Sequence, residues 1–359
     1  MALITLARAA QPTAPPAQSS PGELGRRALK LLATSIFDGD ADVRTAAAAA
    51  WGQIGNPAAA PLLRKALRDK NARVRVEAGY SLHLLGSNEG LAELEAIVRK
   101  GTVPVEGLSA AEEMRWLARS KSRILAIQRL SDVGGEEVVD IFEKTLKDPS
   151  GPVRDATAIA LARMGLDEFE QQFVEATKDQ DENVRAAAIK ALGEIGRPEL
   201  LDPISQAVGD QSEIAREQVM LALAGYADSD ASRLLERGAR DGDARVRSRA
   251  LAVLAGRTDR DDSPLLREIL KPATNPEIAL KCQAGLARRG DRVELDLAER
   301  TLSEKDADLR GLAVDVLKAV EGPAADALLM RVAESDRDGK LRVQAAAALV
   351  KRLGKGTER

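Results

Sequence analysis

The alternation of apolar and polar positions is clearest in residues 179–196, which read DQDENVRAAAIKALGEIG. Ala188, Leu192 and Ile195 are spaced by four and three residues, so they share one face of a helix. Asp181 stands in front of this pattern as a natural N-cap, and Gly196 stands behind it as a glycine stop. The stretch therefore predicts one amphipathic helix with defined ends.

The same pattern recurs along the whole chain when Arg185 is taken as a reference position. Successive reference positions are 31 or 32 residues apart, except for one interval of 48 residues. A small residue usually follows three positions later, and a leucine, or Trp51 in the first unit, follows seven positions later. The ten reference residues are Arg44, Arg75, Arg123, Arg154, Arg185, Arg216, Arg247, Ala279, Arg310 and Arg342. Such a period, with two helical segments in each unit, is typical of an α-solenoid. We therefore predict an all-α chain of about ten helix pairs.

The repeated phrases VRTAAAAAWGQIG, VRVEAGYSLHLLG and VRAAAIKALGEIG resemble HEAT repeats. The similarity is greatest to the short bacterial type that includes the phycobilin-lyase-like repeats, and it extends over roughly residues 22–354. It implies an α-solenoid wound as a right-handed superhelix. It implies little about function, because this repeat is a scaffold in unrelated binding proteins and in a few enzymes.

The ends of the chain depart from the repeat. We expect residues 22–356 to form the solenoid and residues 1–21, rich in Pro, Ser and Ala, to be extended or disordered. Trp51 is expected to be a core residue of an end repeat. Lys351, Arg352, Lys355 and Arg359 give the last helix the polar, basic end that a solenoid cap needs.

The amino-acid composition indicates how the core is built and argues against some classes of function. Apolar residues make up 44% of the chain but aromatic residues only 2%, so the core must be built from Ala, Leu and Val. A net charge of −3 argues against general nucleic-acid binding, which normally shows as a basic excess. No run of 18 apolar residues occurs, so we expect no membrane span. We expect a cytoplasmic protein, or an exported or periplasmic one if the N-terminus is the remnant of a signal peptide.

Residues for catalysis are scarce. His83 is the single histidine and Cys282 the single cysteine, so the chain offers no Ser-His or Cys-His pair and no internal disulfide. One histidine also cannot supply the His-Glu pairs of an iron-binding HEAT enzyme such as deoxyhypusine hydroxylase. Cys282 fills the small-residue position of its repeat, where we expect a buried, inert thiol. We expect no catalytic site, no cofactor and no metal.

An acidic residue stands six positions before the reference arginine in eight of the ten units. These acid–arginine pairs are Asp38 and Arg44, Asp69 and Arg75, Asp148 and Arg154, Asp179 and Arg185, Asp210 and Arg216, Asp241 and Arg247, Glu304 and Arg310, and Asp336 and Arg342. Repeat eight lacks both members, which indicates that the two groups meet, either within a unit or with the turn of the next unit. We expect a ladder of charge-assisted bonds that fixes the stacking of the repeats. On this basis Arg185 and Asp179 should be energetically coupled.

The interval of 48 residues places an insertion of 17 residues in the third unit, at about residues 101–117. Ser109 and Glu112 form a capping box, which predicts a helix that runs on into residues 122–133. Insertions in solenoids often serve binding, and apolar side chains gathered on one element are typical of a binding hot spot. The candidate partner-binding residues are Val103, Pro104, Val105, Leu108, Met114 and Trp116. Trp116 could instead fold back on the end of its own repeat.

These observations favour a non-catalytic scaffold or adaptor that binds another protein, whose identity the sequence does not give. Two alternatives remain open. One is a chromophore-lyase-like or chaperone subunit, which the resemblance to phycobilin-lyase repeats implies. The other is a HEAT-like DNA glycosylase, which would want a basic concave face with aromatic residues. The charge balance and the aromatic count make the glycosylase the weaker alternative.

Overall fold

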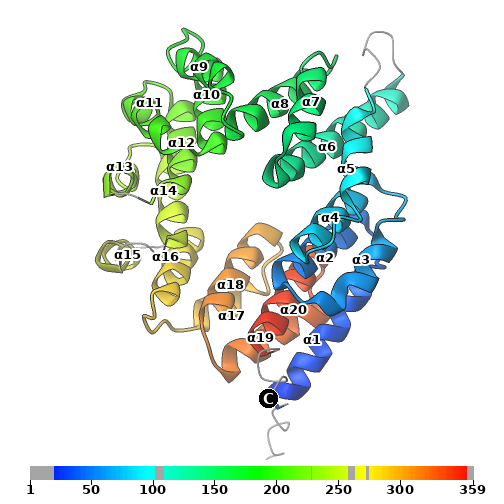
Figure 1. The fold of residues 1–359 in the computed structure, drawn as a ribbon. Coiled ribbons are helices and arrows are strands. Elements are labelled where there is room, and N and C mark those ends of the chain that lie inside the picture. Colours follow the sequence, from blue (N-terminus) through cyan, green and yellow to red (C-terminus); the bar gives the residue numbers. More distant parts are fainter. Residues whose placement is uncertain (1–19, 102–108, 228, 258–262, 272–274, 354–359) are drawn as a thin grey trace, which may run out of the picture.

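The computed structural model describes residues 20–101, 109–227, 229–257, 263–271 and 275–353. Over these ranges the chain is helical, contains no strand and forms ten helix pairs (Figure 1). The first helices of the pairs are α1 (Pro21–Ser35), α3 (Ala60–Ala66), α5 (Leu91–Arg99), α7 (Glu136–Thr145), α9 (Asp167–Ala176), α11 (Leu201–Gln206), α13 (Ser229–Gly238), α15 (Ser263–Leu270), α17 (Asp296–Thr301) and α19 (Pro323–Ser335). The second helices are α2 (Ala41–Ile54), α4 (Ala72–Leu84), α6 (Ala110–Val133), α8 (Gly151–Arg163), α10 (Glu182–Ile195), α12 (Glu213–Ala222), α14 (Ala244–Gly256), α16 (Pro276–Arg288), α18 (Ala307–Ala319) and α20 (Gly339–Leu353).

Four short 3₁₀ segments flank these helices, at Pro57–Ala59, Pro198–Leu200, Ala207–Gly209 and Leu223–Gly225. The prediction of an all-α solenoid with ten helix pairs is confirmed. Of the N-terminal segment, residues 1–19 lie outside the described residues, and α1 begins at Pro21 with Ser20 as its N-cap.

Most second helices begin and end as their local sequence dictates. In α10 the Asp181 carboxylate accepts a hydrogen bond from the backbone N–H of Asn183, which satisfies one of the N–H groups without an intrahelical partner. The same contact is made by Asp40 in α2 and by Asn71 in α4. Gly196 then ends α10 in the left-handed conformation, with φ at 70°. In these repeats the limits of the second helix are thus encoded in the local sequence.

Small side chains allow the second helices of neighbouring repeats to approach closely. A Cβ atom built on Gly193 of α10 would lie 2.6 Å from the Cα of Ala222 in α12. A Cβ atom on Gly52 of α2 would lie 2.5 Å from Oγ of Ser81 in α4, and that hydroxyl donates to the Ala48 carbonyl over 2.9 Å. A larger residue at these positions would push the two helices apart. The alanine-rich, aromatic-poor composition therefore reflects close contact between helix backbones.

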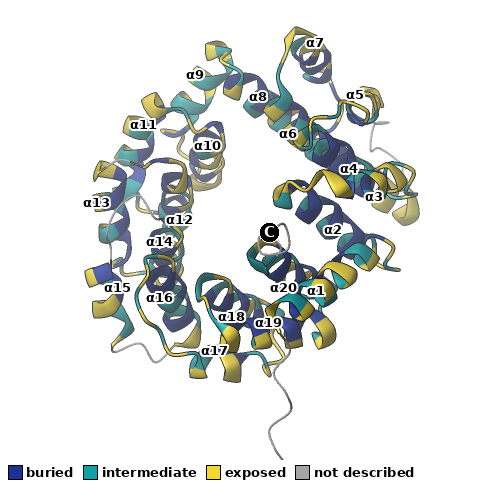
Figure 2. Cartoon of the chain, turned by 60° about the horizontal axis from the view of Figure 1, so that its bottom comes forward, coloured by how far each residue is buried: buried dark blue, intermediate teal, exposed yellow. Residues whose placement is uncertain are grey.

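The ten repeats form a closed ring rather than an open arc (Figure 2). The second helices line its inner side and the first helices lie on its outer side, and α1 packs against α19 and α20. One continuous apolar core contains residues from both ends of the chain, among them Leu24 and Leu32 of α1 and Leu349 and Val350 of α20. Trp51 is buried in this same core, with 3% of its surface exposed.

Polar and close contacts also cross the junction of the two ends. Arg27 of α1 forms an ion pair with Glu334 of α19. A Cβ atom on Gly339, the first residue of α20, would lie 2.3 Å from Cγ2 of Val43 in α2. The expectation that the last helix is an exposed end cap is therefore wrong. The face of α20 that would meet solvent in an open solenoid is covered by the first repeat, because the rotation between repeats brings the tenth repeat back to the first.

Closure of the ring predicts a specific cross-link. An ideal Cβ on Gly25 lies 3.3 Å from the Cβ of Leu353, close to the separation of about 3.8 Å found in disulfides. Mild oxidation of a Gly25→Cys, Leu353→Cys double variant should give a covalently circular monomer with altered mobility on a non-reducing denaturing gel. Burial raises the pKa of the native Cys282 thiol to about 11, so this thiol should not compete.

Each single cysteine variant is the control and should show no such band. Oxidation of the double variant that gives only disulfide-linked dimers would show that the two ends do not meet in solution.

Candidate functional site

The acidic residue six positions before the reference arginine first shapes its own turn. The carboxylate of Asp210 accepts a hydrogen bond from the backbone N–H of Ser212 over 2.8 Å, and Asp241 makes the same contact with Asp243. This turn leaves the main-chain carbonyl of the acid pointing toward the arginine of the same repeat. Nη1 of Arg216 donates to the Asp210 carbonyl oxygen over 2.9 Å, and the equivalent bond occurs in all eight repeats that carry the pair.

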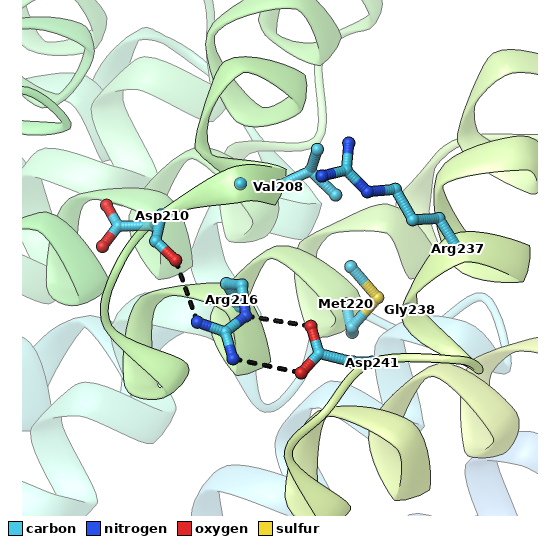
Figure 3. Close-up of a pocket in the computed structure, with 8 residues that line it drawn as sticks. Val208, Asp210, Arg216, Met220, Arg237, Gly238 and Asp241 are labelled. Atoms are coloured by element: carbon cyan, nitrogen blue, oxygen red, sulfur yellow. Dashed lines mark hydrogen bonds and ion pairs between the residues drawn. The ribbon is translucent and has the colours of Figure 1, made fainter.

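The other edge of the guanidinium reaches the acid of the following repeat. Arg216 donates from Nε and Nη2 to both carboxylate oxygens of Asp241, over 2.9 and 3.0 Å (Figure 3). Arg185 binds Asp210 in the same way, with both distances at 2.8 Å. The bidentate pairs of this kind are Arg44 with Asp69, Arg185 with Asp210, Arg216 with Asp241, and Arg310 with Asp336. Each guanidinium thus bridges two successive turns, and we call this series the inter-repeat ladder.

The geometry corrects one expectation about the ladder. The carboxylate bound by Arg185 belongs to Asp210, whereas Asp179 contributes only its main-chain carbonyl, over 2.9 Å. The Asp179 carboxylate is occupied by the N–H of Asp181 in its own turn. A substitution of the Asp179 side chain therefore leaves the bond to Arg185 in place, and the coupling predicted for Asp179 and Arg185 is wrong.

The ladder continues across the point where the ring closes. Nη2 of Arg342 in the tenth repeat lies 3.6 Å from Oδ2 of Asp38 in the first repeat. This is the same relation of arginine to following acid that the other junctions show, although the two residues are at opposite ends of the sequence. The longer distance indicates an ion pair without the bidentate hydrogen bonds of the other rungs.

The ladder is interrupted where the sequence departs from its repeat. At the junction of repeats two and three the acid position holds Leu117, and Nε of Arg75 donates instead to Glu93 over 2.7 Å. Arg123 keeps the forward contact, to Asp148, but its own-repeat carbonyl is that of Val98. Repeat eight has Ala279 at the reference position and so cannot bind the next acid, Glu304. Among the described contacts the regular polar link is thus missing at the insertion and at the eighth repeat. It is also missing between repeats four and five, where Arg154 donates to the Asp148 carbonyl but forms no bond with Asp179.

Acid should weaken the ladder. The hydrogen bond from Arg185 lowers the pKa of Asp210, and that from Arg216 lowers the pKa of Asp241. Their stabilising effect is therefore fully present above the unfolded-state pKa of about 3.9 and is lost as the pH falls through the lowered folded-state values. In thermal unfolding followed by circular dichroism, the native chain should melt higher than an Asp210→Asn, Asp241→Asn variant at neutral pH. The difference should shrink steadily below about pH 4. A difference in melting temperature that stays constant to low pH would show that the ionised carboxylates of the ladder do not stabilise the fold.

The partner of each arginine can be tested by a double-mutant cycle at Arg310, whose side chain is 4% exposed. Arg310→Ala and Asp336→Ala should show a coupling energy of about 1–3 kcal/mol in denaturant unfolding, because the pair is hydrogen-bonded and largely desolvated. The matched control is Glu304→Ala, since Arg310 binds only the main-chain carbonyl of Glu304. Arg310→Ala and Glu304→Ala should add to within about 0.5 kcal/mol. Equal coupling energies in both cycles would contradict the assignment of Asp336 as the acid that binds Arg310.

The insertion forms an extension of α6. The helix begins at Ala110, 13 positions before Arg123, whereas α10 begins three positions before Arg185. Ten extra residues lengthen α6 by about 15 Å at its N-terminus. The predicted capping box is present, with the Glu112 carboxylate accepting from the Ser109 N–H over 2.9 Å, and the helix runs without a break to Val133. The prediction that this helix continues into residues 122–133 is confirmed.

Two of the candidate residues on this extension are described, and they differ in exposure. Met114 is 66% exposed, and Leu117, which was not among the candidates, is 40% exposed. Trp116 is half-buried, and its indole Nε1 is shielded from solvent without a hydrogen-bond partner. Val103, Pro104, Val105 and Leu108 lie outside the described residues. The exposed part of the candidate site is therefore the face of α6 that carries Met114 and Leu117.

One polar cluster on α4, α6 and α8 was not anticipated from the sequence. Nη2 of Arg129 lies 2.7 Å from Oε1 of the buried Glu77, and its guanidinium stands 4.8 Å from the ring centre of Tyr80. The Tyr80 hydroxyl donates to Asp132, which also binds Arg163 over 2.7 Å. Burial, together with the charge of Asp132, raises the pKa of Tyr80 and keeps its hydroxyl a donor. These groups link repeats two, three and four, and they follow no pattern that recurs from repeat to repeat in the sequence.

The remaining candidate groups for chemistry do not come together. His83 shares a hydrogen bond of 3.0 Å with the side chain of Asn88, and Cys282 is fully buried. In the part of the chain that the structure describes, no group of three or more His, Cys, Asp or Glu side chains could hold a metal ion. None of the helices in the described ranges is long and apolar enough to cross a membrane.

The fold and the ladder define a ring-shaped α-solenoid of helix-pair repeats, and comparisons with known proteins identify the repeat. The family model described as HEAT repeats matches residues 27–115 and 170–255. These two stretches of the chain therefore consist of HEAT repeats. A search among curated proteins finds no match to the sequence.

Several solved structures are similar to this chain. Human deoxyhypusine hydroxylase in complex with glycerol is 18% identical, with 82% of this chain and 96% of that chain covered and a TM-score of 0.36. The complex of CpcE and CpcF of phycocyanin lyase from Nostoc sp. PCC7120 is 16% identical, with 72% and 94% covered and a TM-score of 0.37. The archaeal HEAT-like repeats protein from Thermococcus onnurineus NA1 is 17% identical, with 60% and 97% covered and a TM-score of 0.33. We infer no activity for this chain from these structures.

Proposed function

We propose that this HEAT-repeat protein is a non-catalytic scaffold that binds another protein through the N-terminal extension of α6. The extension is the largest departure of the chain from its own repeat, and it projects beyond the other second helices. A structure that needed only to complete the ring would not require ten additional helical residues at this point.

The observation that carries the proposal is the pair of exposed apolar side chains on the extension, Met114 and Leu117. Exposed large apolar residues that lie one turn apart on a helix provide the anchors from which protein interfaces draw most of their energy. Methionine suits this role because its flexible thioether adapts to the surface of a partner. Elsewhere in the described residues five large apolar side chains are exposed, each on a regular repeat: Leu29, Phe37, Leu84, Val184 and Leu221.

The partner can be found and the site tested in two steps. The tagged full chain is first used to isolate binding proteins from the source cells, and the protein recovered is purified and identified. Calorimetric titration then compares its affinity for the native chain, for a deletion of residues 102–115, and for a Met114→Ala, Leu117→Ala variant. We expect the deletion and the double variant to weaken binding by at least about tenfold, because each removes anchor residues.

The matched control is a Leu84→Ala, Leu221→Ala variant, which removes two aliphatic side chains that are 48% and 39% exposed on regular repeats. It should bind the partner with native affinity. Far-UV circular dichroism should show that the deletion variant remains helical, because the cut restores a near-normal repeat length. A deletion variant that is helical and binds the partner with undiminished affinity would exclude this extension as the site.

A further inference from the structure

A groove lies beside the extension of α6, between its side and the turn that leads into α4. Its volume is about 740 Å³, and α4, α5 and α6 all contribute to its lining. These helices are neighbours in the ring (Figure 1). Its described lining comes from the turn before α4 and the start of that helix, from the end of α5 with Lys100 and Gly101, and from one side of α6 that includes Met114 and Leu117 but not Trp116.

The groove stands at the junction where the inter-repeat ladder is broken. In most regular junctions the arginine of one repeat binds an acid 25 residues later, but Lys100 is the residue 25 positions after Arg75, and Leu117, six positions before Arg123, lies within α6. Arg75 therefore turns its Nε to Glu93 and its Nη1 to the carbonyls of Asp69 and Lys70, and no described residue accepts from its Nη2. The loss of the acid removes a negative charge from a place where the other repeats have one.

The described lining is strongly basic and contains no carboxylate. It has seven cationic side chains: Lys70, Arg73, Arg75, Lys100, Arg119, Lys121 and Arg123. Three of these are neutralised by acids outside the lining, Arg73 by Asp42, Arg75 by Glu93 and Arg123 by Asp148. The other four are exposed and form no ion pair with a described residue: Lys70, Lys100, Arg119 and Lys121. A chain with an overall charge of −3 thus concentrates four uncompensated positive charges around one groove.

Apolar groups lie within the same groove. Met114 and Leu117 border it from α6, and the buried Ile97 of α5 also contributes to its wall. No aromatic side chain is among the described lining residues, so the groove offers no platform on which a nucleic-acid base could stack. Positive charge around aliphatic side chains complements a peptide that carries carboxylates on either side of an apolar residue.

We propose that this groove binds an acidic peptide segment, with one apolar side chain of the segment against Met114 and Leu117 and its carboxylates near Lys70, Lys100, Arg119 and Lys121. The inference rests on the proposed function, since it specifies the chemistry of the partner at the same extension. Nη2 of Arg75 provides one further donor to a carboxylate that takes the place of the missing acid.

The probe is a short fluorescein-labelled peptide of glutamates around a central leucine, followed by fluorescence anisotropy with the full chain. It should bind, and its affinity should fall as salt is added, because exposed charges are screened. A Lys70→Glu, Lys121→Glu variant should bind it at least about tenfold more weakly. The matched control is Lys305→Glu, which reverses an exposed lysine at the position of repeat nine that corresponds to Lys70 and should bind like the native chain.

Three further ligands test the chemistry. A peptide with lysines in place of the glutamates should not bind, and neither inorganic pyrophosphate nor a single-stranded oligonucleotide should displace the acidic peptide at comparable concentration. Absence of peptide binding, equal binding by the Lys70→Glu, Lys121→Glu variant, or more effective displacement by the oligonucleotide would each overturn the proposal.

The experiments distinguish a failure of the acidic-peptide proposal from a failure of the proposed scaffold site. If the protein partner binds independently of residues 102–115 while the acidic peptide still binds the groove, the proposed location of the scaffold site fails and the groove remains an acidic-peptide site. If the partner requires the extension but Lys70→Glu, Lys121→Glu leaves its affinity unchanged, the scaffold site holds and the acidic character of its ligand is excluded.

Discussion

The structure depends on a guanidinium that is bonded on both edges. One edge is fixed by a main-chain carbonyl of its own repeat, and the other holds the carboxylate of the next repeat. Because both partners sit in tight turns, the arginine fixes the distance and the rotation between two helix pairs together. The alanines and glycines between the second helices then allow the backbones to meet at the distance that this polar link requires. Burial of apolar surface drives the packing of neighbouring repeats, and the arginine restricts this packing to one geometry.

Much of this architecture could be read from the sequence, because it is encoded within single repeats. Asp181 and Gly196 predict the limits of α10 from local capping rules, and the 31-residue period predicts the number of helix pairs. The partner of Arg185 could not be chosen in this way. Asp179 is six residues before it and Asp210 is 25 residues after it, and because of the repeat period both relations recur along the chain. Only the shape of the turn shows that the first offers its carbonyl and the second its carboxylate.

Neither the closure of the ring nor the groove could be predicted from the sequence, and the reasons differ. Closure depends on a small rotation at each junction, accumulated over ten repeats, and no single residue specifies that sum. Gly339 and Asp38 look like ordinary members of their repeats until the two ends are brought together. The groove lies where the insertion removes the acid that Arg75 would bind, and in the sequence this change shows only as Leu117 in an extended helix pattern. Its consequence is electrostatic and appears in neighbouring repeats.

The contact between α1 and α20 also changes how the order of the repeats along the gene should be understood. In an open solenoid the first and last repeats have one neighbour each and must carry specialised outer faces. Here every repeat has two neighbours, and the described ends of the chain adjoin each other. The junction between α20 and α1 is then one of ten equivalent junctions between repeats. A circularly permuted chain in which a linker joined α20 to α1, and which began at another inter-repeat turn, would retain every repeat interface of the ring.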